Sequence, residues 1–373
     1  MAGYLSLVNG WVVDLEGNDK LHFCSPPVRY AAQGDLLRVG EFVLMPGLVS
    51  RLPYFYRPVV WTPRVEASEK RQLSEQAELL GVTEPEVVVF GGLYDDTWAS
   101  AFSFNPRLNK WRQEQPMPLA LDEHAVCVDG KGQVFVLGGY TNWGERLQIV
   151  HCYNIESQSW RRLPDMLVGR TLLGACFFED RLYVAGGKTG TNFITRAVEV
   201  FDGVSWESLA RPMHQNRAGH GIAVVNQRIY VFGGRDQHGR ILACTEYYSN
   251  GLWHRASAMH SPREKFGIAV HKHCVYVLGG KNFLGRLSEF ECYDTQTDTW
   301  TVLGHMPKRS VFPAVVLLEQ DLYVIGGSDL RTLDAVERYH IPTGVWTSAP
   351  SLPVPRWGHA AVAVVTSRTL RLR

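Results

Sequence analysis

The sequence predicts an all-β fold, a six-bladed β-propeller, from three observations. Two adjacent glycines occur six times, each pair 46 to 48 residues after the one before. A tryptophan follows each pair by 20 to 22 residues, so the two features recur in phase. Each repeat also contains four short segments of strand composition, which favours propeller blades. The glycine pairs are Gly91-Gly92, Gly138-Gly139, Gly186-Gly187, Gly233-Gly234, Gly279-Gly280 and Gly326-Gly327.

The fourth repeat shows the order of its strands most clearly. Residues 219–225 are small or β-branched, a polar two-residue turn follows, and residues 228–232 lead into the glycine pair. This pattern predicts a hairpin. A third strand passes through Tyr248, and a fourth begins at Trp253. We expect the paired glycines to end the second strand where a side chain would obstruct the backbone.

The two ends of the repeat array complement each other. In the first repeat, residues 73–84 have the composition of a helix or linker, and residues 87–90 already match a second strand. Residues 356–365 repeat the first-strand pattern, but no second strand follows them. We therefore predict that the C-terminal strand becomes the innermost strand of the first blade, which leaves no open sheet edge.

These assignments divide the chain into four parts. Residues 1–61 form an N-terminal segment without a sustained apolar period, and residues 62–86 form a charged linker punctuated by prolines. The propeller occupies residues 87–366, and residues 367–373 form a C-terminal tail.

Composition excludes several classes of function. The formal net charge is +1, so we expect no general attraction to nucleic acid or to an anionic membrane. The chain shows neither a signal-peptide pattern nor an apolar run long enough to span a membrane, and we expect a cytoplasmic protein. Its seven cysteines lack a CxxC spacing and are expected to be buried free thiols.

Catalytic motifs are absent, and we expect neither an enzyme nor a cofactor or metal site. The sequence has no nucleophile elbow, P-loop, HExxH motif or recurring carboxylate pair. His124, His220 and His359 begin equivalent first strands, but on separate blades, and are expected to line the channel. Residues 271–274 contain dense ligand types, yet neighbouring side chains in a strand alternate between faces, so we interpret them as an exposed turn.

The loops after the glycine pairs vary while the strands repeat, which favours them as the functional surface. Basic residues gather in the third to fifth repeats, and acidic residues such as Asp95 and Asp96 gather in the first two. Such a field orients charged partners, although loop charges can also serve solvation alone. The partner-binding candidates in these loops are Lys188, Arg235, Arg240, Lys281 and Arg286, with the aromatic residues Trp143 and Phe283 as anchors.

Three groups of residues resemble kelch repeats. They are residues 217–220 (RAGH), residues 229–234 (IYVFGG) and residues 291–300, which begin with glutamate and end with tryptophan. The resemblance extends over about residues 87–365. Residues 297–310 and 333–346 are most similar to the BTB–kelch (Kelch-like) group, and residues 36–52 resemble a late helix of its BACK region.

The resemblance also implies a role for arginines that recur where the first strands begin. In BTB–kelch proteins, arginines at this position bind short acidic segments of substrates, because a guanidinium pairs bidentately with a carboxylate. The matching residues here are Arg170, Arg217, Arg263, Arg309 and Arg356, with Asp122 in the second repeat. Repetition at one position also fits a structural requirement, so both interpretations remain open.

By resemblance, the function is protein recognition. The propeller would bind a short acidic or polar segment of a protein substrate as part of a cullin-3 ubiquitin ligase adaptor. A BTB domain needs more residues than precede the propeller, which argues against cullin-3 binding. A kelch scaffold for cytoskeletal or signalling proteins is the alternative, and a propeller enzyme is a weaker one.

Overall fold

The computed structural model describes residues 84–366, apart from residues 143 and 191, and five short strands within residues 3–44. All of the regular secondary structure assigned in these residues consists of β-strands. The chain divides into two compact units: Pro85–Thr366, and Met1–Glu84 together with Ser367–Arg373. A search of the described residues finds no helix that is long and apolar enough to cross a membrane.

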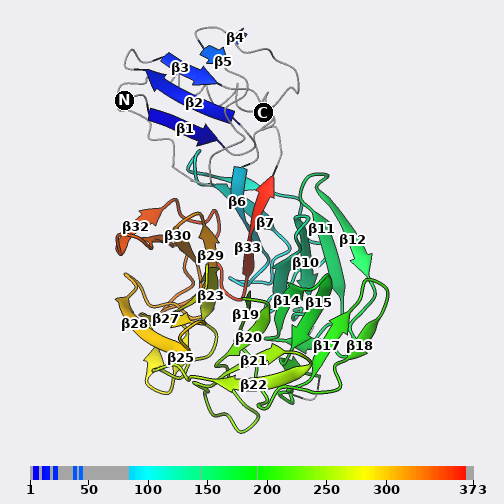
Figure 1. Ribbon diagram of the computed structural model, residues 1–373. Coiled ribbons are helices and arrows are strands. Elements are labelled where there is room, and N and C mark those ends of the chain that lie inside the picture. Colours follow the sequence, from blue (N-terminus) through cyan, green and yellow to red (C-terminus); the bar gives the residue numbers. More distant parts are fainter. Residues whose placement is uncertain are drawn as a thin grey trace. The chain divides into compact units, whose positions relative to one another are not determined.

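The repeats form the six-bladed propeller that their period predicts (Figure 1). Each blade is a four-stranded sheet, and its strands are lettered A to D from the inside outward. Blade 1 consists of β33 (Ala360–Thr366), β6 (Glu84–Phe90), β7 (Ala101–Asn105) and β8 (Lys110–Gln113). Blade 2 consists of β9 (Ala125–Val128), β10 (Gln133–Leu137), β11 (Val150–Asn154) and β12 (Ser159–Leu163). Blade 3 consists of β14 (Gly174–Phe178), β15 (Arg181–Ala185), β17 (Val198–Phe201) and β18 (Trp206–Ser208).

The remaining blades repeat this order. Blade 4 consists of β19 (Gly221–Val225), β20 (Arg228–Phe232), β21 (Thr245–Ser249) and β22 (Leu252–Ala256). Blade 5 consists of β23 (Gly267–His271), β24 (Cys274–Leu278), β27 (Glu289–Asp294) and β28 (Thr299–His305). Blade 6 consists of β29 (Ala314–Leu318), β30 (Asp321–Ile325), β31 (Val336–His340) and β32 (Val345–Ala349). The A strands contact their neighbours around a complete ring, from β9 through β14, β19, β23, β29 and β33 back to β9.

Closure of blade 1 by the C-terminal strand is confirmed. Strand β33 pairs with β6, so the last strand of the chain completes the first blade. Just before β33, Trp357 N donates to Leu93 O at 3.1 Å, and Leu93 N donates to Trp357 O at 2.8 Å. The inner edge of β6 is therefore paired, and blade 1 has four strands like the others.

The repeat tryptophans connect neighbouring blades. Trp206 on strand D of blade 3 donates from Nε1 to the Pro164 carbonyl oxygen of blade 2 at 2.8 Å. Trp300 of blade 5 makes the same bond to Ser257 of blade 4 at 2.9 Å. Trp111 of blade 1 makes the equivalent bond to Pro350 of blade 6 at 2.9 Å. The buried indole nitrogens of Trp160 and Trp253 have no hydrogen-bond partner within the described part of the chain, but Trp160 packs against Phe90 of the neighbouring blade with ring centres 5.8 Å apart. The tryptophan spacing thus follows from how one blade packs on the next.

The glycine pairs are fixed by a close contact between blades. Gly233 and Gly234 have φ values of 54° and 92°. A Cβ on Gly233 would lie 2.6 Å from the Arg263 carbonyl oxygen of the next blade. Gly234 N donates to that same oxygen at 2.9 Å. Both the left-handed backbone and the close approach therefore require glycine.

The N-terminal strands form a separate five-stranded sheet in the order β1-β2-β3-β5-β4. Their bounds are β1 (Gly3–Leu7), β2 (Trp11–Glu16), β3 (Lys20–Phe23), β4 (Leu37–Val39) and β5 (Phe42–Leu44). Strands β4 and β5 lie where the BACK resemblance implied a helix, so that expectation is wrong for these segments. The helix-or-linker prediction for residues 73–84 lies outside the described residues except for Glu84, which begins β6, and the predicted tail lies wholly outside them.

Candidate functional site

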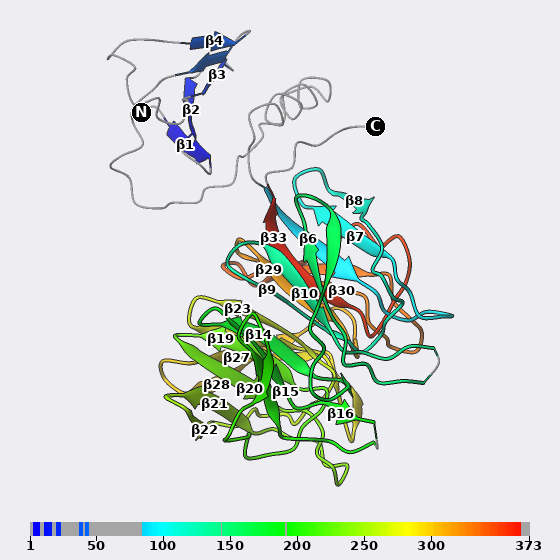
Figure 2. The same ribbon diagram turned by 90° about the vertical axis from the view of Figure 1, so that its right-hand side faces the viewer.

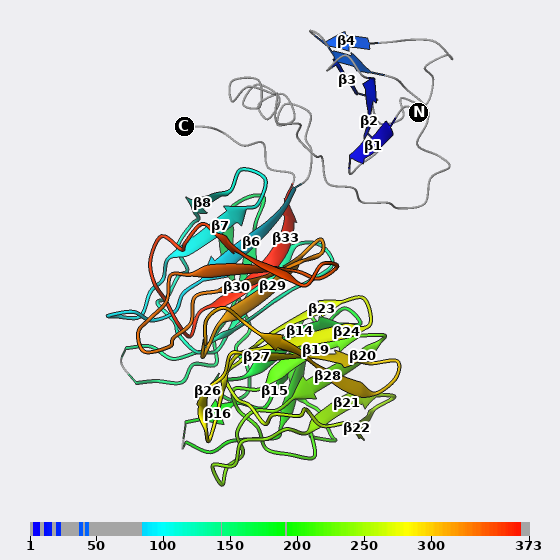
Figure 3. The same ribbon diagram turned by 90° about the vertical axis from the view of Figure 1, so that its left-hand side faces the viewer.

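The varied loops gather on one face of the propeller. Each B strand ends at its glycine pair and each A strand begins at the same end of the blade, so the BC loops and the DA loops share this loop face. Two two-stranded sheets on it extend the regular structure: β13 (Arg170–Thr171) with β16 (Lys188–Thr189), and β25 (Lys281–Asn282) with β26 (Gly285–Arg286). Figures 2 and 3 show β16 at one end of the blades, and Figure 3 labels β26 at the same end.

Backbone hydrogen bonds hold the DA loops together around the channel mouth. Six equivalent residues adopt left-handed φ values of 51° to 65°. Five N–H to carbonyl bonds of 2.7–2.9 Å join each of them to the next. In order of these bonds, the residues are Gly358, Glu123, Leu172, Gly219, Lys265 and Phe312. Lys265 Nζ lies 3.8 Å from Glu123 Oε1 and 4.5 Å from the centre of the Phe312 ring.

Four of the five predicted arginines lie inside the propeller. Arg170 is 1% exposed, and Arg217, Arg263 and Arg356 are 0% exposed. Each guanidinium donates to the carbonyl oxygen of the first glycine in a pair, as Arg217 Nη1 does to Gly233 at 2.7 Å. These side chains present no surface to a partner. Because these four arginines are buried, they fit the structural interpretation of the repeated arginines and not the expected direct contact with a partner.

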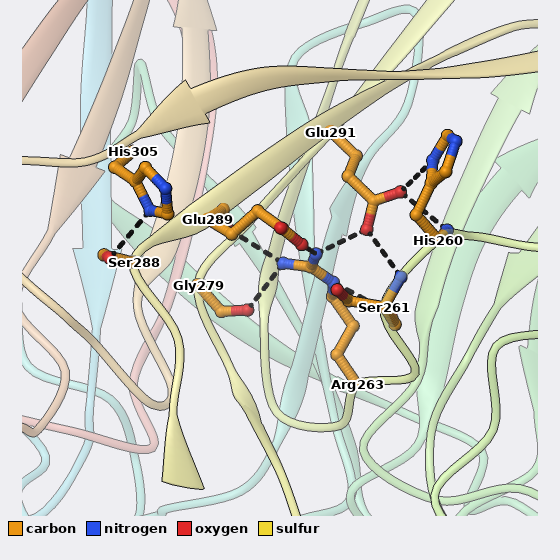
Figure 4. Close-up of polar contacts among 8 residues, drawn as sticks. All are labelled: His260, Ser261, Arg263, Gly279, Ser288, Glu289, Glu291 and His305. Carbon is orange, nitrogen blue, oxygen red and sulfur yellow. Dashed lines mark hydrogen bonds and ion pairs between the residues drawn. The ribbon is translucent and has the colours of Figure 1, made fainter. Parts of the chain in front are cut away.

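Blade 5 shows what this structural role is (Figure 4). Arg263 pairs through Nη2 with Glu291, which is fully buried on strand C. The same carboxylate accepts the backbone N–H of His260 at 2.8 Å and of Ser261 at 3.2 Å. The pair therefore holds the DA loop against the sheet, because a buried carboxylate needs several hydrogen bonds. We call this arrangement of arginine, glutamate and loop the DA clamp.

Blades 3 and 4 contain the same clamp. Arg170 pairs with Glu199, and Arg217 pairs with Glu246. Burial alone would raise the pKa of Glu246, but Arg217 and hydrogen bonds from His214 lower it below its ordinary value. The carboxylate thus stays ionised inside the propeller.

Blade 6 departs from this pattern at Ser310. Ser310 Oγ donates to Gly326 O at 2.9 Å, as the clamp arginines do at their glycine pairs. The fifth predicted arginine, Arg309, is therefore one residue away from the clamp position, and it is exposed. The blade 6 glutamate, Glu337, has Lys308 Nζ at 3.3 Å instead.

Blades 1 and 2 depart in other ways. In blade 1, Arg356 lies 5.0 Å over the Phe102 ring, and burial lowers the pKa of Arg356 to about 10. In blade 2 the clamp position is Leu121, because its carbonyl oxygen accepts a hydrogen bond from Gly92 N at 2.8 Å, as the clamp arginine carbonyls do at their glycine pairs. The expectation that Asp122 takes the place of the arginine is therefore wrong by one residue. Burial, with Glu123 beside it, raises the pKa of Asp122 to about 7.

Most of the predicted basic loop residues have acidic partners. Arg235 Nη2 lies 2.6 Å and Lys281 Nζ 3.6 Å from Oε1 of Glu264, which is 2% exposed. Arg240 Nε donates to Asp236 Oδ2 at 2.7 Å. The basic sector predicted from the sequence is therefore largely neutralised within its own loops.

Two adjacent BC loops expose large apolar side chains. Phe283 is 72% exposed, as a predicted anchor should be, and its neighbour Leu284 is 96% exposed. Leu330 on the BC loop of blade 6 is 92% exposed. Arg286 Nε lies 4.0 Å from Asp329 Oδ1, which brings these two loops side by side. Sequence reasoning missed both leucines, although their loop positions after a glycine pair were a usable signal.

The other predicted contacts lie elsewhere. Lys188 is half-buried in β16, away from the loops of blades 5 and 6. Trp143 lies outside the described residues.

The three equivalent histidines lie between blades and do not line the channel. Each is 7–8% exposed. A Cβ on Gly91 of blade 1 would lie 2.8 Å from His124 Cε1 of blade 2, so the imidazole packs on the preceding blade. Burial lowers the pKa of His124 to about 4 and that of His359 to about 3. They are neutral packing groups on separate blades and form no common site.

This fold, with a repeated interior and varied loops on one face, defines a class of proteins: propellers that serve mainly as protein-interaction modules. Two family models match the chain. The KLHDC2/KLHL20/DRC7 Kelch-repeats domain matches residues 175–370, and the Kelch motif matches residues 123–167. The first match covers more than half of the chain, so the chain belongs to the kelch-repeat family.

Several curated proteins are similar to the chain. Alpha-scruin of Limulus polyphemus is 26% identical over 71% of this chain and 31% of its own length. Kelch-like protein 40 of Xenopus laevis is 29% identical over 42% of this chain and 26% of its own length. Human Kelch-like protein 38 is 26% identical over 62% of this chain and 41% of its own length. The matched regions thus span less than half of each relative.

Proposed function

We propose that the propeller binds a segment of a partner protein across the BC loops of blades 5 and 6. The observation that carries this proposal is the exposure of Phe283, Leu284 and Leu330 on two adjoining loops. Apolar side chains gathered on neighbouring loops are typical of protein contact sites, where aromatic residues commonly supply most of the binding energy.

The charge around these side chains favours an acidic segment. Three basic residues of the loops around them, Lys281, Arg286 and Lys308, lie within 4.0 Å of carboxylates. Arg309 and Arg331 form no ion pair among the described residues, and they are the charges that remain for a partner. Arg309 lies beside the blade 5 loop, because the neighbouring Ser310 carbonyl accepts a hydrogen bond from Gly280 N at 2.8 Å. An exposed guanidinium next to an apolar tip suits a segment that combines carboxylates with apolar side chains.

A peptide library selected on the full chain tests this function. We expect enriched peptides with acidic residues next to aliphatic or aromatic ones. The double variant Phe283→Ala/Leu284→Ser should lose their binding. A matched control is Val204→Ser, because Val204 is 79% exposed on the turn between strands C and D of blade 3, at the opposite face. Equal binding to both variants would place the site elsewhere.

The finer proposal is that the chain acts as the substrate receptor of a cullin-3 ubiquitin ligase adaptor. Its support is the similarity to Kelch-like proteins 40 and 38. Copurification of cullin-3 with the full chain tests it. The Phe283→Ala/Leu284→Ser variant should keep cullin-3 while losing the peptide, because the two partners would bind different surfaces. Peptide binding without cullin-3 would favour the scaffold function instead.

A further inference from the structure

A cluster of metal-ligand side chains lies on blade 5, at the face opposite the loop face. The turn between strands A and B brings His273 and Cys274 to the start of β24, and Cys274 pairs in register with Asp294 at the end of β27. One ligand atom from each of these three residues lies within 4.8 Å of the others.

The turn explains why strand alternation does not separate these side chains. Lys272 has a φ of 58°, so His273 follows a left-handed residue and not a regular strand. Its carbonyl oxygen accepts from Thr295 N at 3.1 Å and from Thr295 Oγ1 at 2.8 Å. These bonds hold the turn against the end of β27. The sequence-based interpretation treated residues 271–274 as an exposed turn whose side chains alternate between faces, and it missed Asp294.

The spacing fits a bound cation better than a direct hydrogen bond. His273 Nε2 lies 3.6 Å from Asp294 Oδ2, which exceeds hydrogen-bond length. Two ligands of a tetrahedral zinc ion lie roughly 3.5 Å apart, given metal–ligand distances of about 2.0–2.3 Å. Cys292 lies two residues before Asp294 on β27, and therefore on the same face of the sheet, where it offers a second sulfur.

We propose that His273, Cys274 and Asp294 bind a zinc ion, with Cys292 available as a fourth donor. Imidazole, thiolate and carboxylate together form a borderline ligand set that suits zinc better than magnesium or calcium. The three side chains are only partly buried, so an ion can reach them. The ion would join the AB turn of blade 5 to strand C. This site is independent of the proposed partner-binding loops.

Metal titration of the purified, reduced full chain tests the proposal. Zinc, in competition with a chromophoric chelator, should bind with one ion per chain. Cys274→Ser and His273→Ala should each weaken zinc binding by at least about 10- to 100-fold. That is the usual effect of removing a residue that only hydrogen-bonds to a metal ligand, and loss of a ligand itself should cost no less. The matched controls Cys244→Ser and His238→Ala, both in blade 4, should leave zinc binding unchanged. Substituted cobalt should show thiolate charge-transfer absorption that Cys274→Ser abolishes.

Two outcomes would overturn the proposal. One is the absence of saturable zinc binding by the wild type, and the other is zinc binding that the two ligand variants retain as fully as the two controls do. Thermal unfolding of each variant identifies one that fails to fold. If Cys274→Ser does so, Asp294→Asn takes its place, because Asp294 is 31% exposed and its amide preserves the shape of the side chain. Zinc should also raise the melting temperature of the wild type and leave that of Asp294→Asn unchanged.

Discussion

Lys265 and Glu123 form an ion pair between the DA loops of blades 5 and 2, which are three blades apart in a ring of six. Lys265 Nζ lies 3.8 Å from Glu123 Oε1, and each side chain is 20% exposed. Together with the backbone bonds between the DA loops, this pair occupies the channel mouth. A partner therefore meets the raised BC loops around the mouth and not an open channel.

Arg217→Ala should destabilise the propeller by about 3–5 kcal/mol. The change leaves Glu246 ionised and buried without its partner, which is the costly way to break a buried pair. It also removes the bond to Gly233. Denaturant unfolding of the two proteins measures the difference.

Arg309→Ala is the control for this experiment. Arg309 is exposed and lies outside the clamp, so its loss should change the free energy of unfolding by no more than about 0.5 kcal/mol. Similar losses in the two variants would contradict the assignment of a structural role to the buried arginines.

Asp122→Asn should stabilise the protein increasingly as the pH rises. The pKa of Asp122 is about 7 in the folded protein against 3.8 ordinarily. Between about pH 4 and pH 7, Asp122 is ionised in the unfolded chain but protonated in the folded protein. The free energy of unfolding of the wild type therefore falls by up to about 1 kcal/mol for each unit that the pH rises. The asparagine variant cannot ionise there.

The measurement is the difference in unfolding midpoint between Asp122→Asn and wild type at pH 5, 6, 7 and 8. The difference should grow up to about pH 7 and then level off, and it should be absent for the exposed Asp95→Asn. A difference that does not depend on pH would refute the raised pKa. The buried histidines destabilise both proteins equally as the pH falls below about 6.5, because their pKa values are lowered in the folded state. Their contribution cancels when the midpoint of the wild type is subtracted from that of the variant.

Gly234→Ala should cost more than Gly251→Ala. Both glycines have left-handed φ values, 92° and 79°, so each alanine incurs about 1–3 kcal/mol of backbone strain. Only at Gly234 would the new Cβ also lie 2.8 Å from His220 Cβ, whereas nothing lies within 4 Å at Gly251. Equal losses of thermal stability would show that space between the blades is not what requires the glycine pairs.

Removal of residues 356–373 should destroy cooperative unfolding of the whole propeller. The deletion takes away β33, exposes the edge of β6 and breaks the bond from Arg356 to Gly91. Aggregation should follow. Removal of residues 367–373 alone leaves β33 intact and should preserve both the melting temperature and the monodisperse size-exclusion profile.

The sequence predicts the fold far better than it predicts the site, and the clamp shows why. The glycine period follows from a contact that every blade repeats, such as Gly234 N to Arg263 O, and three of the repeat tryptophans, Trp111, Trp206 and Trp300, donate to a carbonyl of the neighbouring blade. The period is therefore visible without a structure. The arginines repeat for the same reason, and repetition made a packing residue resemble a binding residue. Arg309 is exposed and Arg217 is buried because Arg309 lies one residue before the clamp position of its blade. A shift of one residue is not evident from the repeat pattern.

The zinc cluster illustrates a second limit. Cys274 and Asp294 are twenty positions apart in sequence and become neighbours only through strand pairing. Likewise, the loops that carry Leu284 and Leu330 are close only because they belong to neighbouring blades. Such sites depend on tertiary register, which a repeat pattern read along one chain does not specify.

The affinity of the full chain for a selected acidic and apolar peptide, measured by calorimetry in wild type and two variants, tests the central claim most directly. Phe283→Ala/Leu284→Ser should weaken binding at least tenfold, the equivalent of about 1.4 kcal/mol, and Val204→Ser should leave it unchanged. Undiminished affinity in the first variant, with its fold intact, would contradict the claim that the BC loops of blades 5 and 6 form the binding site.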